Sequence, residues 1–346
     1  MYAGVCNRGN AYKLCVRFVL RSPVMAFTTR RMLLGSVLAV GGILFLAVAS
    51  VNRNLKCATC RLKDADSFSL VDVSRRADDL CHIPSTCRAP EADRQRELAD
   101  VMTGYTGSRI SASDAGLIDR IRKHFIDLPR PYVTKFSMPI VETPQAKEVS
   151  RILKHKKQGF FVECGALDGE RSSNTIWLEQ KQSWNGLLIE MDPSYYLQVR
   201  GKNRKCYSIN ACLSPEEYPI KMQFKEHTMG EGRLVTDTKI SQQDQHLIHD
   251  SYCFPLYSLM LALNRTRIDY FSLDVEGMEL PILKSIPFDK LDIAVLTVEY
   301  KHGKDKSEYA DFMRHKGYKK VKELNFFIKE LYLGGCDFVF VREDLL

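Results

Sequence analysis

Residues 160–170 read FFVECGALDGE and predict the first strand and ligand loop of an α/β sheet. A strand expected at Gly159–Cys164 runs into a loop whose two glycines, Gly165 and Gly169, let the backbone turn tightly against a ligand. A helix is expected through Asn174–Gln182, and the apolar run LLIE at 187–190 predicts the next strand. These parts make a parallel βαβ unit with a right-handed crossover.

The alternation of strands and helices continues to the C-terminal end of the sequence. It predicts a mostly parallel α/β sheet with helices on both faces, and an antiparallel hairpin at one edge from the last two strands. The further strands are expected at Tyr207–Leu213, Tyr270–Val275, Ile293–Tyr300, Lys319–Glu323 and Cys336–Val341. The further helices are expected at Lys147–Lys157, Tyr257–Asn264 and Glu308–Lys316.

Polar and acidic residues follow the strands of this predicted sheet, where ligands of such sheets bind. Glu190 ends the second strand, 25 residues beyond Gly165, about the separation at which a carboxylate binds a ribose diol. Asn210 ends the third strand and Asp274 the fourth. The alternative is that Glu190 lies in an ordinary loop and that Asp274 caps a helix. Taken together, the acids favour a cationic, phosphate-free nucleoside such as S-adenosylmethionine (SAM).

The region before this sheet contains one long apolar segment. Met32–Val51 is 20 residues without a charge, which as a helix spans about 30 Å, the thickness of the bilayer core. We expect an uncleaved signal-anchor; the alternative is a signal peptide cleaved after Ala47-Val48-Ala49. Both place the rest of the chain outside the cytosol. The expected organisation is a basic cytosolic tail at 1–31, the anchor at 32–51, a lumenal stem at 52–140 and the α/β domain at 141–346.

The charge distribution favours a membrane over a nucleic acid as partner. The composition is that of a globular protein, 45% hydrophobic and 27% charged over 346 residues, with a net charge of +8. The tail at 1–31 holds six basic residues and no acidic one, and four more basic residues follow the apolar segment at 52–63. The excess positive charge therefore flanks the anchor, whereas a nucleic-acid-binding domain carries it on the fold itself.

Nine of the eleven cysteines follow the apolar segment, and in an oxidising lumen some of these nine should pair. Cys81 with Cys87, and Cys212 with Cys253, are candidate disulfides, although connectivity cannot be deduced from sequence. A CxxC motif at 57–60 has no second ligand pair nearby, so no metal site is predicted. Asn264 begins an N-R-T glycosylation acceptor, in keeping with a lumenal loop.

Five segments resemble the FkbM-type SAM-dependent methyltransferase domain over about residues 145–343: FFVECGALDGE, LLIEMDP, INACLS, FSLDVEGMELPIL and IAVLTVEY. Further segments are similar to the Star-like animal branch of that family: GALDGE with the following SSNT, CFPLYSLMLALN and SIPFDKLDI. The resemblance implies a Rossmann-like class I methyltransferase sheet. It also implies a type II single-pass protein of the endoplasmic reticulum, Golgi and late endosome that takes part in the export of EGF receptor ligand precursors.

The resemblance also implies roles for individual residues. Asp274 matches the fourth-strand acid that faces the reacting centre, and Leu167 stands where the common pattern has a third glycine. From their positions on or just after the fourth and fifth strands, Glu276, Glu299 and His302 are further acid–base candidates, and Asp274 and Glu276 are the residues expected to be catalytic. The alternative is that Glu276 braces the helix after Gly277. Two functions remain open: an escort that uses the fold as a binding module without catalysis, or an active SAM-dependent O-methyltransferase acting on a lumenal glycan or small molecule. The residues expected to bind SAM are Glu163, Gly165, Ala166, Asp168, Gly169, Glu190, Met191, Asp192, Asn210 and Ala211.

Overall fold

The computed structural model describes residues 2–7, 12–17, 100–106, 109–129, 136–202, 204–227, 232–235, 247–303, 305–328 and 333–346. The chain divides into two compact units, residues 1–97 and 98–346. In the first, β1 (Tyr2–Asn7) and β2 (Tyr12–Arg17) pair antiparallel. The expected anchor at 32–51 and the expected Cys81–Cys87 disulfide lie outside the described residues. Among the described residues, no helix has the length and apolar character needed to cross a membrane.

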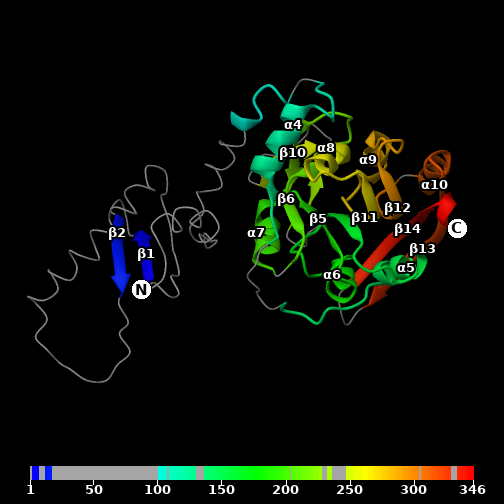
Figure 1. The fold of residues 1–346 in the computed structure, drawn as a ribbon, viewed down its shortest axis with the longest axis horizontal. Coiled ribbons are helices and arrows are strands. Elements are labelled where there is room, and N and C mark those ends of the chain that lie inside the picture. Colours follow the sequence, from blue (N-terminus) through cyan, green and yellow to red (C-terminus); the bar gives the residue numbers. More distant parts are fainter. Residues whose placement is uncertain are drawn as a thin grey trace, which may run out of the picture. The chain divides into compact units, whose positions relative to one another are not determined.

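The second unit is built on an eight-stranded sheet with the order β13-β14-β12-β11-β4-β5-β6-β3 (Figure 1). Its five central strands run parallel, as the sequence predicts. Their carboxyl ends therefore meet at one edge of the sheet, where such sheets bind ligands. The central strands are β4 (Phe160–Cys164), β5 (Asn185–Glu190), β6 (Tyr207–Asn210), β11 (Arg267–Leu273) and β12 (Asp292–Glu299).

Antiparallel strands close the sheet on both sides. The expected C-terminal hairpin is present: β13 (Tyr318–Ile328) pairs with β14 (Leu333–Arg342), which pairs with β12. At the opposite edge, the two-residue strand β3 (Ile126–Asp127) pairs with β6.

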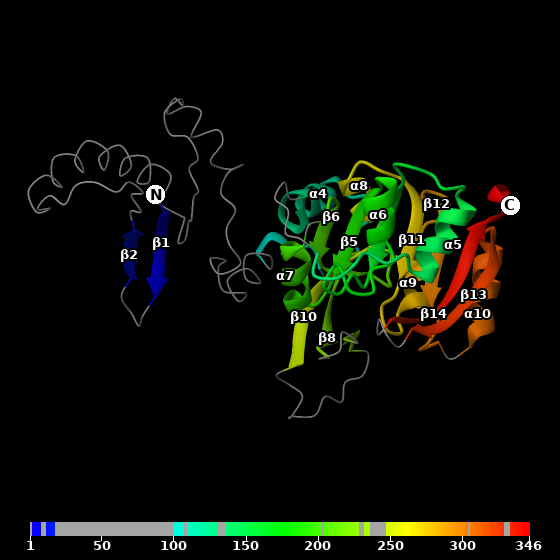
Figure 2. The same cartoon turned by 90° about the horizontal axis from the view of Figure 1, so that it is seen from below.

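Helices cover both faces of the sheet because its strands are apolar on both sides (Figure 2). Along β4, Phe160 and Val162 join one core and Phe161 the other. The first core includes residues of α4 (Ala115–Arg120), α8 (Leu256–Ala262), α9 (Glu279–Ser285) and α10 (Lys306–His315). The second includes residues of α5 (Pro144–Ile152), α6 (Ile176–Gln182) and α7 (Pro193–Gly201).

The strand expected over Tyr207–Leu213 is divided. β6 ends at Asn210, and β7 (Cys212–Leu213) enters a second sheet of order β7-β10-β8-β9. The division follows from the pairing: the Ala211 amide donates to the Glu190 carbonyl, after which Cys212 pairs with Cys253 and forms a disulfide with it. The other strands of this sheet are β8 (Ile220–Lys225), β9 (Arg233–Leu234) and β10 (Ile248–Phe254).

Part of the expected stem packs into the domain. Asp114 caps α4 by accepting the Leu117 amide, and α4 continues as a π-helical turn, η2 (Ile121–Phe125). Phe125 is 2% exposed and packs against Phe254 at 4.8 Å between ring centroids. The domain therefore begins before residue 141.

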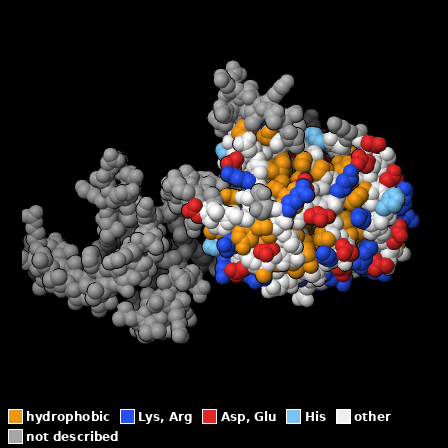
Figure 3. Space-filling model, turned by 90° about the horizontal axis from the view of Figure 1, so that it is seen from above, with side chains coloured by type: hydrophobic (Ala, Val, Ile, Leu, Met, Phe, Trp, Pro, Cys, Tyr) orange, Lys and Arg blue, Asp and Glu red, His pale blue; other side chains and the backbone are white. Residues whose placement is uncertain are grey.

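The helix expected at Lys147–Lys157 lies earlier, at α5. Thr143 caps it by accepting the Ala146 amide, and Pro144 occupies the first turn, where a missing amide costs nothing. Lys154 and His155 have positive φ angles, so the helix ends before them. On the face of the domain seen in Figure 3, basic and acidic side chains are interspersed with apolar ones.

Candidate active site

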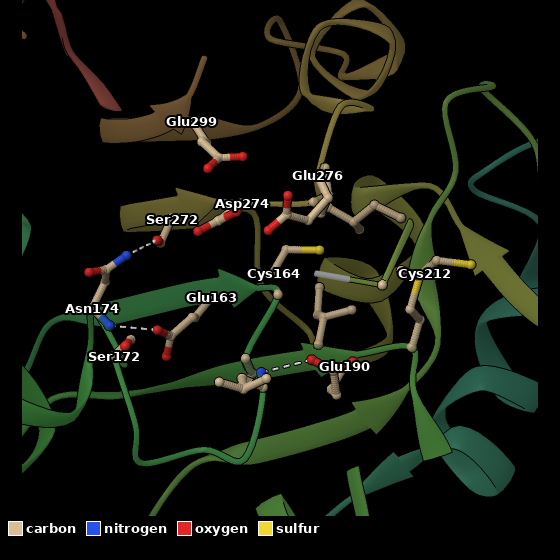
Figure 4. A pocket seen from close by; sticks show the side chains of 18 of the residues that line it. Glu163, Cys164, Ser172, Asn174, Glu190, Cys212, Ser272, Asp274, Glu276 and Glu299 are labelled. Carbon is tan, nitrogen blue, oxygen red and sulfur yellow. Dashed lines mark hydrogen bonds between the residues drawn. The ribbon is translucent and has the colours of Figure 1, made fainter. Parts of the chain in front are cut away.

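A cavity of about 270 Å³ lies at the carboxyl ends of β4, β5, β11 and β12 (Figure 4). Residues of the second sheet, Cys212, Leu213 and Leu234, also line it. Of the residues expected to bind SAM or to react, eight line the cavity: Glu163, Gly165, Ala166, Glu190, Met191, Ala211, Asp274 and Glu276. The other four, Asp168, Gly169, Asp192 and Asn210, are not among the lining residues.

The loop after β4 brings backbone to the edge of the cavity. Gly165 has a φ of +86°, and a Cβ built on it would lie 1.9 Å from the carbonyl oxygen of Asp274. Only glycine therefore fits between β4 and β11 at this point. The next residue but one, Leu167, also has a positive φ, +51°, although it carries a side chain. Such a conformation costs a non-glycine residue about 1 kcal/mol or more, so surrounding contacts must hold it.

Glu190 supplies that contact and projects into the cavity. Its Oε2 accepts the Leu167 amide at 2.7 Å and its Oε1 accepts the Asp192 amide at 2.8 Å. Burial raises the pKa of Glu190 to about 8, against the effect of these two hydrogen bonds, which favour the charged form. Each carboxylate oxygen keeps a second lone pair, so a ribose diol placed in the cavity has an acceptor.

Asp192, two residues further along the chain, and Asn210, on the neighbouring strand β6, fix the backbone around Glu190. Asp192 caps α7 by accepting the amides of Ser194 and Tyr195, so its carboxylate serves the helix. Asn210 donates from Nδ2 to the carbonyl oxygens of Glu190 at 2.9 Å and Met191 at 3.1 Å. It therefore fixes the end of β5 from the neighbouring strand.

Glu163 lines the cavity, but its oxygens are occupied within the protein. It accepts the Asn174 amide at 2.6 Å, the Ser173 hydroxyl at 2.9 Å and the Thr175 hydroxyl at 2.5 Å. The buried Arg204 lies 3.9 Å away and donates to the carbonyl of Gly169. Glu163 thus orders the loop before α6 and is not free to bind a ligand.

Asp168 and Gly169 form the turn of the same loop. Asp168 accepts the amides of Glu170 and Arg171, and Gly169 has a φ of +78°. Sequence reasoning missed Arg204, which also donates to Glu179 at 2.9 Å and to Thr175 at 2.9 Å. No sequence signal separates this buried arginine from a solvated one.

Three carboxylates gather on the side of the cavity formed by β11 and β12: Asp274, Glu276 and Glu299 (Figure 4). Glu276 has a φ of +57° and lies 2.7 Å from Nε2 of His302. Burial, followed by the neighbouring carboxylates, raises the pKa of both Asp274 and Glu299. Adjacent carboxyl groups that cannot both ionise hold a proton between them.

One family model and several solved structures are similar to this chain. The model of the "Methyltransferase FkbM domain" matches residues 163–320. A similar solved structure is methyltransferase FkbM from Methylobacillus flagellatus KT, 13% identical, with 71% of this chain and 60% of that one covered and a TM-score of 0.35. Another is precorrin-6y C5,15-methyltransferase from Geobacter metallireducens GS-15, 13% identical, with 62% and 95% covered and a TM-score of 0.33.

A third similar structure is 1,6-didemethyltoxoflavin-N1-methyltransferase from Burkholderia thailandensis, which was determined with S-adenosylhomocysteine bound. It is 10% identical, with 84% and 97% covered and a TM-score of 0.31. The comparison with curated proteins gives no match. Residues 163–320, then, match the model of a methyltransferase FkbM domain and lie in the mostly parallel α/β sheet.

Proposed function

We propose that the domain binds SAM in the strand-end cavity and transfers its methyl group to an acceptor oxygen. The carboxylate of Glu190 carries this proposal. It ends β5, faces the cavity, and lies beside the Gly165 turn, where backbone and ligand can approach closely. This is the position at which a carboxylate receives the ribose hydroxyls of a nucleoside in such sheets.

The charge of the cavity supports a cationic ligand. Glu190, Asp274, Glu276 and Glu299 line it, whereas its basic lining residues are Arg171 and Lys301. A sulfonium near these carboxyl groups favours their charged form and is attracted to it, whereas a phosphate-bearing nucleotide would be repelled by it. The carboxyl groups of Asp274 and Glu299 are also placed to take the proton that an acceptor hydroxyl loses.

The proposal is tested by calorimetric titration of the full-length protein with S-adenosylhomocysteine. We expect micromolar binding that Glu190→Ala abolishes and that the exposed-site control Glu343→Ala leaves unchanged. Glu190→Ala removes the acceptor of two backbone amides, so its folding is checked by thermal unfolding. Leu167→Gly provides a second variant, because it keeps the amide that Glu190 binds and removes bulk from the loop. We expect it to bind at least as tightly; absence of binding in folded wild-type protein would refute the proposal.

We further propose that the chain is a single-pass membrane protein of the secretory pathway with this domain in the lumen. The apolar segment 32–51 supports this placement, as do the Cys212–Cys253 disulfide and the exposed Asn264 of the glycosylation acceptor. In this compartment the domain would serve the export of membrane cargo such as EGF receptor ligand precursors, as the resemblance to the Star-like branch implies.

The Glu190→Ala substitution distinguishes a role in export from methyl transfer. If the domain acts in export as a binding module, cells carrying Glu190→Ala export the cargo as the wild type does, while S-adenosylhomocysteine binding is lost. Loss of export by a folded Glu190→Ala protein would contradict this escort role. The lumenal placement is checked by glycosidase treatment, which should shift the wild type and not Asn264→Gln.

A further inference from the structure

The acidic side of the cavity contains two overlapping sets of metal-ligating groups. Among the described residues, Glu276, Glu299 and His302 each offer a ligand atom, and these atoms all lie within 4.8 Å of one another. The same holds for Asp274, Glu279 and Glu299. Glu299 belongs to both sets. The groups come from the ends of β11 and β12 and from the start of α9, so the fold brings together residues that are distant in sequence.

Glu299 differs from the other buried carboxylates that surround the cavity. Glu163 and Glu190 accept hydrogen bonds on both oxygens, and Glu279 accepts the amides of Val275 and Gly277. Glu299 is 6% exposed and lines the cavity, yet its Oε2 has no hydrogen-bond partner among the residues that the structure describes. A buried acceptor left unpaired costs about 1–3 kcal/mol, and more when it is charged.

The neighbouring charges act on Glu299 in opposite directions. Burial and then Asp274, Glu276 and Glu279 raise the pKa of Glu299, whereas Lys301, which also lines the cavity, lowers it by less than any of these. Burial also raises the pKa of the Cys164 thiol well above its ordinary value, so Cys164 is a neutral neighbour. The cluster thus has more carboxylates than cations.

We propose that Glu276, Glu299 and His302 bind a hard divalent cation at the edge of the cavity, with Asp274, which belongs to the second set, beside Glu299. Carboxylate oxygens with one imidazole nitrogen are donors suited to Mn²⁺, Mg²⁺ or Ca²⁺ rather than to a thiolate-preferring ion. Two oxygens on opposite sides of Ca²⁺ lie about 4.6–5.2 Å apart, and on opposite sides of Mg²⁺ about 4.0–4.2 Å. Ligand atoms that all lie within 4.8 Å of one another can share one such ion after small movements of the side chains.

The role of this cation rests on the proposed methyl transfer, whereas its binding does not. A cation held between β11 and β12 would share the cavity with the ligand of Glu190. It would coordinate an acceptor that offers paired oxygens, such as a vicinal diol, and favour the loss of a hydroxyl proton. The acceptor class is then an oxygen-rich molecule rather than an apolar one.

The test is a titration of the full-length protein with MnCl₂, followed by the electron paramagnetic resonance signal of free Mn²⁺. We expect one Mn²⁺ per chain, displaced by Ca²⁺, and at least tenfold weaker binding in Glu299→Gln. Glu308→Gln, an exposed carboxylate paired with Lys284, is the matched control and should bind as the wild type does. His302 is accessible, so His302→Ala gives a second variant that should fold and bind more weakly.

Two results would overturn the cation site: no binding by folded protein up to millimolar Mn²⁺, or binding that neither Glu299→Gln nor His302→Ala weakens. Titration of the same samples with S-adenosylhomocysteine separates this proposal from the proposed function. S-adenosylhomocysteine binding without Mn²⁺ binding refutes the cation alone. Mn²⁺ binding without S-adenosylhomocysteine binding refutes the nucleoside site alone.

Discussion

Binding of a ribose by Glu190 should depend on pH, because its raised pKa lies within the experimental range. Ribose hydroxyls donate hydrogen bonds, so the charged carboxylate is the form that binds them. A proton on Oε2 or Oε1 would also take the lone pair that a ribose hydroxyl needs, because each oxygen already accepts one amide. With a pKa of about 8, Glu190 is mainly protonated at neutral pH in the free protein. The affinity should therefore rise with pH and level off above about 8.

The size of the effect follows from that pKa. Each unit of pH below it weakens binding tenfold, which is about 1.4 kcal/mol. At pH 6, two units below the pKa of Glu190, binding should be roughly 100-fold weaker than at the plateau, a loss of about 2.7 kcal/mol. The folded protein binds this proton more tightly than the unfolded chain does. Its contribution to stability is thus present below about pH 4.5 and is lost as the pH rises through about 8.

The assay uses 5′-methylthioadenosine, which keeps the ribose and adenine but has no group that titrates between about pH 6 and pH 9. Its dissociation constant is measured over that range by calorimetry, with the fold checked at each pH. The 2′,3′-dideoxy analogue and the Glu190→Gln variant are controls, and both should lose the pH dependence. A pH-independent affinity in the wild type, or the same slope in Glu190→Gln, would refute the assignment of the ribose to Glu190.

Three further predictions concern the framework of the site. Gly165→Ala should lower the free energy of unfolding by about 3 kcal/mol or more, because the added Cβ would meet a backbone carbonyl. The control Gly201→Ala has open space around its Cβ and should leave the free energy of unfolding unchanged or raise it. Urea unfolding measures both. Arg204→Met should cost about 3–5 kcal/mol in the same assay by leaving buried carboxylates unpaired; a change below 1 kcal/mol would contradict the network. Reduction of Cys212–Cys253, which closes a loop of 41 residues, should remove about 4 kcal/mol and weaken nucleoside binding, as thermal unfolding and calorimetry with and without dithiothreitol would show.

The central sheet could be predicted because buried parallel strands are continuous apolar runs. FFVEC and IAVLTVE each lie in the sheet within one or two residues of the expected range. The second sheet could not be predicted in this way. β8 is a sequence of mixed polarity, IKMQFK, and β9 has only two residues, so neither gives a period that separates a strand from a loop.

The site was predictable where chemistry depends on position along one strand. Glu190 follows from its place at the end of LLIE, and the Gly165 turn follows from the glycine itself. What a carboxylate contacts depends on tertiary packing. Glu163 and Asp168, like Glu190, are acidic residues expected from the sequence to bind SAM. Their oxygens instead accept hydrogen bonds from the loop before α6.

The proposed cation site could not be predicted from the sequence for the same reason. The cysteine motif at 57–60 indicates no metal site, and the acidic residues have no characteristic ligand spacing. Asp274 and Glu299 are 25 residues apart, and only the pairing of β11 with β12 brings the ends of their strands together. The unpaired oxygen of Glu299 is likewise a property of packing, because it depends on which donors reach the cavity.

A crystal structure of the protein with S-adenosylhomocysteine would show directly whether the strand-end cavity is a nucleoside site. We expect density for the nucleoside in the cavity, with both ribose hydroxyls within hydrogen-bond distance of Glu190 and the sulfur facing Asp274. An empty cavity in crystals grown at saturating ligand, or a nucleoside bound elsewhere on the domain, would contradict it.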